Sequence, residues 1–126
     1  MGFMADRAEF EIFSKAVRIY LDWANKNIPG FQALLLMLQD EFNVNSQEEA
    51  LREILLNPEK FYNAIMKQTG STIVAESHLY LIICSFIDLF KLPFNATTVV
   101  KVMRKGRWDE LRELVRQAGS HLSEKI

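Results

Sequence analysis

The amino-terminal part of the chain alternates apolar and charged positions with the period of an α-helix. Between residues 6 and 26, apolar side chains recur every three or four positions and charged side chains form a second stripe. The break at residues 27–30, where Pro29 suits the first turn of a helix, predicts a second helix over about 29–41. Its apolar residues cover more than one stripe, so we expect it to contact two neighbouring helices.

Cap and turn signals divide most of the remaining chain into shorter helices. Ser46 followed by Glu49 matches a capping box and predicts a helix over about 47–56. The run Asn57-Pro58-Glu59 is a start signal for the next helix, which stops at Gly70. Two helices follow residue 94, and the apolar stripe of the last comprises Trp108, Leu111, Val115 and Ala118. Strand-like alternation occurs only ambiguously, at residues 97–103.

Residues 72–92 form the most apolar segment of the chain. Ser71 or Thr72 can cap it and Pro93 prevents its continuation, while only Asp88 and Lys91 are charged between residues 78 and 92. The unbroken apolar run is shorter than the roughly 20 residues of a membrane span, so we expect no membrane partner. A helix this apolar is typical of the middle of a bundle. The pattern predicts an all-α fold, a single compact bundle of six or seven helices around a central apolar helix at about 72–92.

Length and composition fit one domain. The chain has 126 residues, of which 49% are hydrophobic and 25% charged, enough for one core. We expect a single helical domain over residues 1–126, with a short flexible start at about 1–5 and a polar tail at about 120–126. A single cysteine cannot form an internal disulfide, and the amino terminus lacks the pattern of a signal peptide. We therefore expect a cytoplasmic protein.

Few residues suit catalysis or metal binding. His78 and Cys84 lie about 240° apart around a helix, so they cannot hold one metal together, and His121 falls in the polar tail. Apolar neighbours favour an inert Cys84 and a satisfied or partly buried His78. For Asp88 we expect exposure near the helix end, with a salt bridge to a neighbouring helix as the alternative. Since no phosphate loop, nucleophile elbow or zinc-helix motif occurs, we expect no enzyme, no cofactor and no metal.

Positive charge is concentrated near the carboxyl end. Residues 95–126 hold 7 Lys/Arg against 4 Asp/Glu, whereas residues 1–94 hold 8 against 12. The candidate contacts for nucleic acid or an acidic partner are Lys101, Arg104, Lys105, Arg107, Arg112 and Arg116. Interleaved Asp109, Glu110 and Glu113 can pair along the helix, which favours a solvated helical face as the simpler interpretation.

The segment at residues 45–92 resembles small archaeal all-helical proteins of the Nitrosopumilus output domain group. The resemblance rests on Pro58 and Phe61, on Gly70, and on the capped apolar helix that follows directly. It implies an archaeal, cytoplasmic regulatory or interaction domain, and it brings no catalytic residues.

Three functions agree with these observations. The first is a non-enzymatic interaction or regulatory module that acts through protein–protein contact as a homodimer, using surplus apolar surface at residues 10–24 or 31–42. The second is a nucleic-acid-associated regulator that uses the basic residues between 101 and 116. The third is a small-molecule sensor with an interhelical apolar pocket, in which His78, Tyr80 or Asp88 would orient the ligand.

Overall fold

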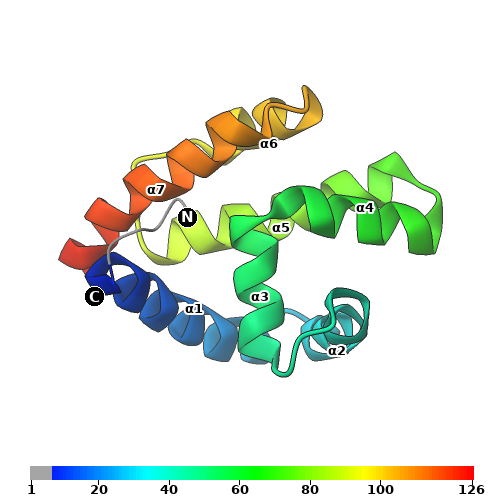
Figure 1. Cartoon of the computed structure of the whole chain (residues 1–126), viewed down its shortest axis with the longest axis horizontal. Helices are drawn as coiled ribbons and strands as arrows, with labels where there is room; N and C mark the ends of the chain where they lie inside the picture. The colour runs from blue at the N-terminus through cyan, green and yellow to red at the C-terminus, as the bar shows by residue number, and fades with distance from the viewer. Residues whose placement is uncertain (1–6) are drawn as a thin grey trace.

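The computed structural model describes residues 7–126 and, within them, every side chain except that of Val115. This part of the chain contains no strand, and its helices are α1 (Arg7–Asn27), α2 (Phe31–Phe42), α3 (Gln47–Leu56), α4 (Pro58–Thr69), α5 (Thr72–Leu89), α6 (Ala96–Arg104) and α7 (Trp108–Lys125) (Figure 1). The predicted all-α bundle of six or seven helices is confirmed. The predicted flexible start at residues 1–5 lies outside the described residues.

Side-chain caps fix where helices begin. The Ser46 hydroxyl accepts a hydrogen bond from the Glu49 backbone N–H at 3.1 Å, and the Glu49 carboxylate accepts one from the Asn45 backbone N–H at 3.4 Å. The reciprocal bond therefore reaches one residue further back than in the standard capping box. Ser71 caps α5 in the same manner, accepting from the Val74 N–H at 3.2 Å.

The end of α5 differs from the prediction by three residues. Lys91 takes a left-handed conformation with φ 52°, and the Leu92 backbone N–H donates to the Ile87 carbonyl at 3.0 Å. This is the Schellman arrangement, and a non-glycine residue in it costs about 1–2 kcal/mol. Leu92 is buried in the core, which offsets that cost. Gly106 ends α6 with φ 70° without such a penalty.

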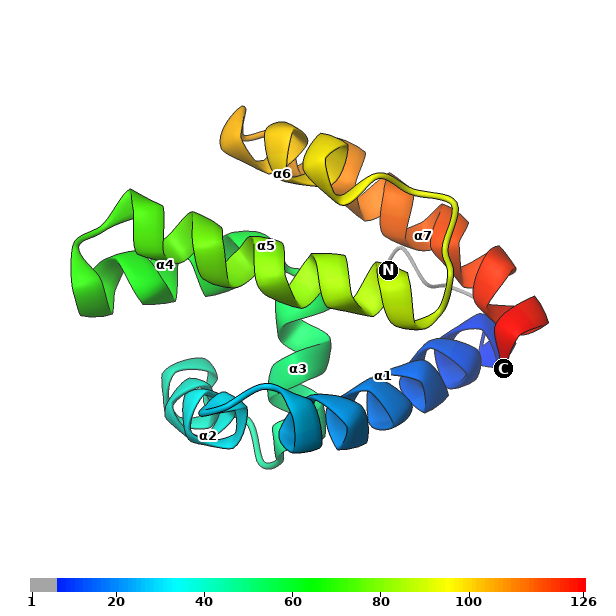
Figure 2. The same ribbon diagram turned by 180° about the vertical axis from the view of Figure 1, so that it is seen from behind.

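α3 packs against α1, α2 and α4, and α5 packs against α4 and α6 (Figure 1). Seen from behind, α5 is nearest the viewer, with α6 and α7 on one side and α1 on the other (Figure 2). The start of α1 meets the end of α7 so closely that a Cβ added at Gly119 would lie 3.0 Å from the Glu9 carboxylate. Only a glycine fits there without displacing the Glu9 side chain.

Aromatic rings join α1, α2 and α5 at the centre of the core. The Tyr20 ring lies edge-on to Phe31 and to Phe86, with ring centroids 6.0 and 5.5 Å apart. Phe86 also packs against Phe13 at 6.3 Å and Phe90 at 5.1 Å. Because residues 13–31 and 86–90 are far apart in the sequence, the aromatic cluster links the amino-terminal helices to α5.

Only one face of α5 belongs to the core. Its buried residues are Ala75, Leu79, Ile82, Ile83, Phe86 and Ile87. On the opposite face, Ile73 is 74% exposed, Leu81 47% and Tyr80 42%. The expectation of an apolar helix surrounded on all sides is therefore wrong, because the other helices lie beside and behind α5 and none covers its outer side (Figure 2).

The predicted polar tail at residues 120–126 is also corrected. α7 continues to Lys125, and Leu122 is completely buried. Leu111 and Ala118 are buried too, and Leu122 extends their stripe by one further turn. His121 is half-buried, with its ring edge-on to Phe94 at 6.1 Å. Val115, predicted for the same stripe, has a side chain outside the described ones.

Candidate functional site

The exposed side of α5 carries the largest group of uncovered apolar side chains on one described helix. We call it the outer strip of α5, and it consists of Ile73, Ser77, Tyr80, Leu81, Cys84 and Asp88. All are exposed except Cys84, which is half-buried. Their spacing places them within an arc of about 100° around the helix. The outer strip is therefore one continuous surface.

Hydrogen bonds to α1 fix the rotation of α5 and hence the direction of the outer strip. The Tyr20 hydroxyl lies 2.5 Å from Ser85 Oγ and 3.3 Å from the Ile82 carbonyl oxygen. Ser85 in turn donates to the Leu81 carbonyl at 2.7 Å. Burial raises the pKa of Tyr20 to about 12, against the opposing effect of the Ser85 hydrogen bond. Tyr20 therefore remains a neutral donor that anchors α5.

The polar residues of the outer strip are paired with each other. The Cys84 thiol donates to Asp88 Oδ2 at 3.7 Å. Burial raises the pKa of Cys84, and the negative charge of Asp88 adds to the effect. A raised pKa favours the protonated thiol, which is a poorer nucleophile than the thiolate. Asp88 is exposed near the helix end, as predicted, and has no salt bridge to another described helix.

The three residues predicted to orient a ligand do not surround a pocket. His78 is exposed, and its Nδ1 lies 2.8 Å from the Val74 carbonyl oxygen of its own helix, to which it donates. Tyr80 and Asp88 belong to the outer strip. The apolar cavity of the molecule lies on the opposite side of α5, and none of the three lines it. A ligand in that cavity would not meet them.

The basic residues predicted to contact nucleic acid are largely neutralised by acids. The four pairs, with their N–O distances, are Arg104–Glu76 at 2.6 Å, Arg107–Glu110 at 3.6 Å, Arg112–Asp109 at 2.9 Å and Arg116–Glu113 at 3.0 Å. Hydrogen bonding to Arg116 lowers the pKa of Glu113. Lys101 and Lys105 are exposed and pair with no acid in residues 7–126. This arrangement favours the solvated helical face.

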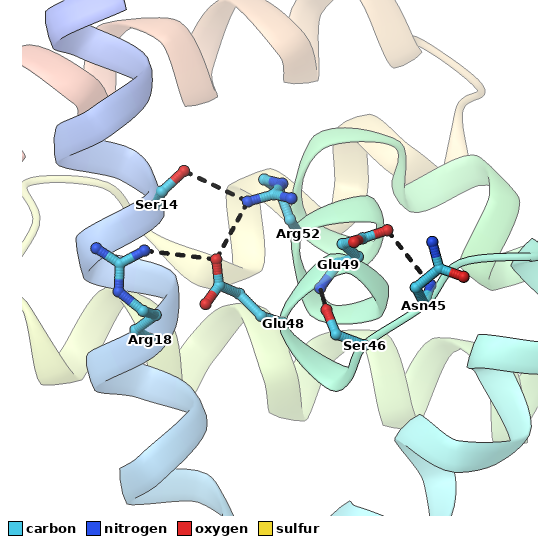
Figure 3. Close-up of polar contacts among 7 residues, drawn as sticks. All are labelled: Ser14, Arg18, Asn45, Ser46, Glu48, Glu49 and Arg52. Atoms are coloured by element: carbon cyan, nitrogen blue, oxygen red, sulfur yellow. Dashed lines mark hydrogen bonds and ion pairs between the residues drawn. The ribbon is translucent and has the colours of Figure 1, made fainter.

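A polar cluster between α1 and α3 was not predicted from the sequence. Arg52 lies 3.4 Å from both the Ser14 hydroxyl and the Glu48 carboxylate, and Arg18 lies 3.5 Å from the same carboxylate (Figure 3). The Arg52 guanidinium also covers the Phe10 ring at 5.3 Å. Because each guanidinium has a partner within the cluster, its role is to hold α3 against α1. The spacing of Glu48 and Arg52 was a visible signal, whereas Arg18 is 30 residues away from Glu48.

The described residues contain no cluster of metal ligands and one helix that is apolar enough to cross a membrane. In the part of the chain that the structure describes, no three His, Cys, Asp or Glu side chains gather as a metal site would require. One described helix, α5, is long and apolar enough to cross a bilayer, with a mean hydropathy of 1.5 over 18 residues. Core helices of soluble proteins meet this criterion as well, so it is weak evidence for a membrane.

Comparison with known proteins adds no relative. No protein-family model, no curated protein and no solved structure matches the chain. The resemblance of residues 45–92 to the output domain group stays a prediction. Function must therefore be inferred from the surfaces of the molecule.

Proposed function

We propose that the protein is a non-enzymatic helical interaction module that pairs with a second copy of itself through the outer strip of α5. The main support is the exposure of Ile73, Tyr80 and Leu81 on one helix face, since contiguous apolar surface in a small protein marks an association site. The predicted homodimer is kept, but its surface moves from α1 or α2 to α5. On α1, Phe10 is covered by Arg52, and the exposed Ile19 lies about 180° around the helix from it, so the two form no common patch. On α2, Leu36 is the one large apolar side chain that is exposed among the described residues.

The order of residues along the outer strip supports a symmetric pair. The positions of the strip residues are spaced symmetrically about the midpoint between Tyr80 and Leu81. Ser77 and Cys84 are equally far from this midpoint, and so are Ile73 and Asp88. If two copies of α5 pack antiparallel about a twofold axis at this midpoint, each Tyr80 meets the partner's Leu81. A twofold interface requires one patch that fits itself; this arrangement matches Tyr80 with Leu81 at the centre, whereas at the two ends Ile73 faces the partner's Asp88.

The side-chain sizes suit such a contact. Large side chains, Tyr80 and Leu81, lie at the centre, and the small Ser77 and Cys84 on either side let the two helices approach closely. Asp88 is at the rim, where its carboxylate keeps its water. One helix pair is a small interface, so we expect a dissociation constant in the micromolar range.

A bilayer is a less suitable partner for the same helix. Phe86 on the inner face of α5 packs against Tyr20 and Phe13 of α1. Inserting all of α5 into lipid would separate these rings and place Asp88 in or near hydrocarbon, which is costly. A second copy covers the outer strip without disturbing the core.

Engineered cysteines test the pairing directly. In a Cys84→Ser background, Tyr80→Cys places two thiols beside the proposed axis, whereas Ile19→Cys places an equally exposed thiol on α1. We expect mild oxidation to give a covalent dimer of the Tyr80→Cys protein at micromolar concentration, and much less of the Ile19→Cys protein. Leu81→Cys should behave like Tyr80→Cys, because it lies on the other side of the same midpoint.

Two outcomes would contradict the proposal. One is equal cross-linking of all three variants, or none of them, in protein whose helical circular dichroism is unchanged. The other is co-sedimentation of the wild-type protein with phosphatidylcholine vesicles while it remains monomeric without lipid, which would identify a membrane as the partner.

A further inference from the structure

We infer that the cavity between the α6–α7 hairpin and the inner face of α5 binds the end of a hydrocarbon chain. The cavity has a volume of 50 Å³. Its walls come from α1, α3, α5, α6 and α7 and from the segment after α5. They include Phe13, Ile83, Val99, Leu111 and Ala118. This site goes beyond the proposed self-association and uses other residues.

The chemistry of the walls selects the ligand. Every side chain that lines the cavity is apolar, so a water molecule inside would find no side-chain hydrogen-bond partner. A charged or polar group would lose its hydration without compensation. A saturated hydrocarbon group has no hydrogen bonds to lose and gains contact with the surrounding carbon atoms. The walls therefore favour an aliphatic group.

The size of the cavity further limits which apolar groups can bind. Its 50 Å³ exceeds the roughly 10–15 Å³ that one water needs, but it is well below the volume of about 150 Å³ in which a protein cavity holds benzene. This volume therefore suits the narrow end of an aliphatic chain better than a ring.

The cavity is partly open to solvent, which gives the remainder of the chain a way out. Its lining residues are buried except Phe94 and Leu114, which are half-buried. These two side chains therefore form the mouth. Phe94 lies in the segment between α5 and α6, and its ring packs edge-on against His121. A longer chain would enter between Phe94 and Leu114 and leave its polar end outside.

Xenon and 1-octanol are suitable probes, with methyl NMR as the readout. We expect xenon to produce saturable chemical-shift changes at the methyl groups of Ile83, Val99 and Leu111. The methyl groups of Leu38, which is fully buried on α2 but does not line the cavity, are the internal reference and should not respond. Added 1-octanol should reverse the xenon shifts, because its chain end competes for the same space.

Filling the cavity provides the control. Ala118→Leu places a larger side chain in the cavity wall and should abolish the xenon shifts, whereas Ala33→Leu, at an exposed position on α2, should leave them unchanged. If Ala118→Leu does not fold, Val99→Phe fills the cavity from α6. Absent shifts in the wild-type protein, or shifts that persist in a folded filled variant, would overturn the site. Failure of octanol to compete would overturn the hydrocarbon-chain ligand. Neither result depends on whether the protein dimerises.

Discussion

The outer strip of α5 and the basic segment at residues 101–116 are both exposed. They differ in how many of their side chains find interaction partners within the same chain. All four arginines in the basic segment form ion pairs with acids of the same chain. In the outer strip, Ile73, Tyr80 and Leu81 remain uncovered by any described helix. A charged surface that is already balanced has little left to offer a partner, whereas an uncovered apolar surface does.

The physical reason for this difference is the range of each interaction. A charge on a helix can find its partner three residues away, as Arg112 does at Asp109 and Arg116 at Glu113. An apolar side chain on the outside of a helix needs another helix to cover it, and none of the other helices in residues 7–126 packs on this side of α5. Binding of a second molecule at the outer strip would therefore bury the most apolar surface.

The largest expected effect is the difference in stability between substitutions on the two faces of α5. Ile82→Ala should lower the free energy of unfolding by about 2–4 kcal/mol, because it leaves a cavity in a tightly packed core. Leu81→Ala, one residue away on the outer strip, should change it by less than about 1 kcal/mol in dilute, monomeric protein. Urea unfolding measures both, and equal losses would contradict the assignment of the two faces.

The next effect concerns the hydrogen bonds that orient the outer strip. The pKa of Tyr20 is about 12 in the folded state against 10.0 for an ordinary tyrosine. The folded state thus favours the protonated phenol, and this contribution, on the order of 2–3 kcal/mol, is complete below pH 10 and is lost as the pH rises through 12.

Tyr20→Phe should therefore lose about 1 kcal/mol of stability at pH 7, through its missing hydrogen bond, and should show a smaller decline between pH 10 and 12 than the wild type. Tyr62→Phe is the matched control, since Tyr62 forms no side-chain hydrogen bond with the described residues and is half-buried. Stability curves of equal slope for wild type and Tyr20→Phe would rule out this role for Tyr20.

A third prediction tests whether acids neutralise the basic segment. Replacing Asp109 by Asn and both Glu110 and Glu113 by Gln releases three arginines, so elution from heparin should require more salt. The control removes the same number of acids where none pairs with a described base, at Asp40, Glu59 and Glu124. An equal shift for both triple variants would show that only net charge matters.

The smallest effect is expected for the ion pair between α6 and α5. Arg104 lies 2.6 Å from Glu76, but its side chain is 57% exposed, so Arg104→Ala should cost less than about 1 kcal/mol and the loss should shrink in high salt. Lys105→Ala is the comparison, since it has no such partner. Thermal unfolding at low and high salt distinguishes them, and a larger, salt-independent loss for Arg104→Ala would show that its aliphatic packing matters more.

Local signals in the sequence were enough to predict most of the helix boundaries. The Ser46 cap is formed by residues within three or four positions of each other, so it could be seen without the fold. The pairing of Arg18 with Glu48 could not, because it depends on how α1 meets α3. The exposed side of α5 was missed because Leu81 and Ile82 are equally apolar. Ser77, Cys84 and Asp88, all on one side, were the available signal.

The most direct test of self-association is sedimentation equilibrium over a concentration series of the wild-type protein, Leu81→Glu and Leu36→Glu. Leu36 is 54% exposed on α2, so the two variants add the same charge at two exposed leucines. Pairing through the outer strip predicts that wild type and Leu36→Glu shift from monomer to dimer in the micromolar range, while Leu81→Glu stays monomeric. A wild-type protein that remains monomeric at high micromolar concentration, or a Leu81→Glu variant that dimerises as well as Leu36→Glu, would contradict it.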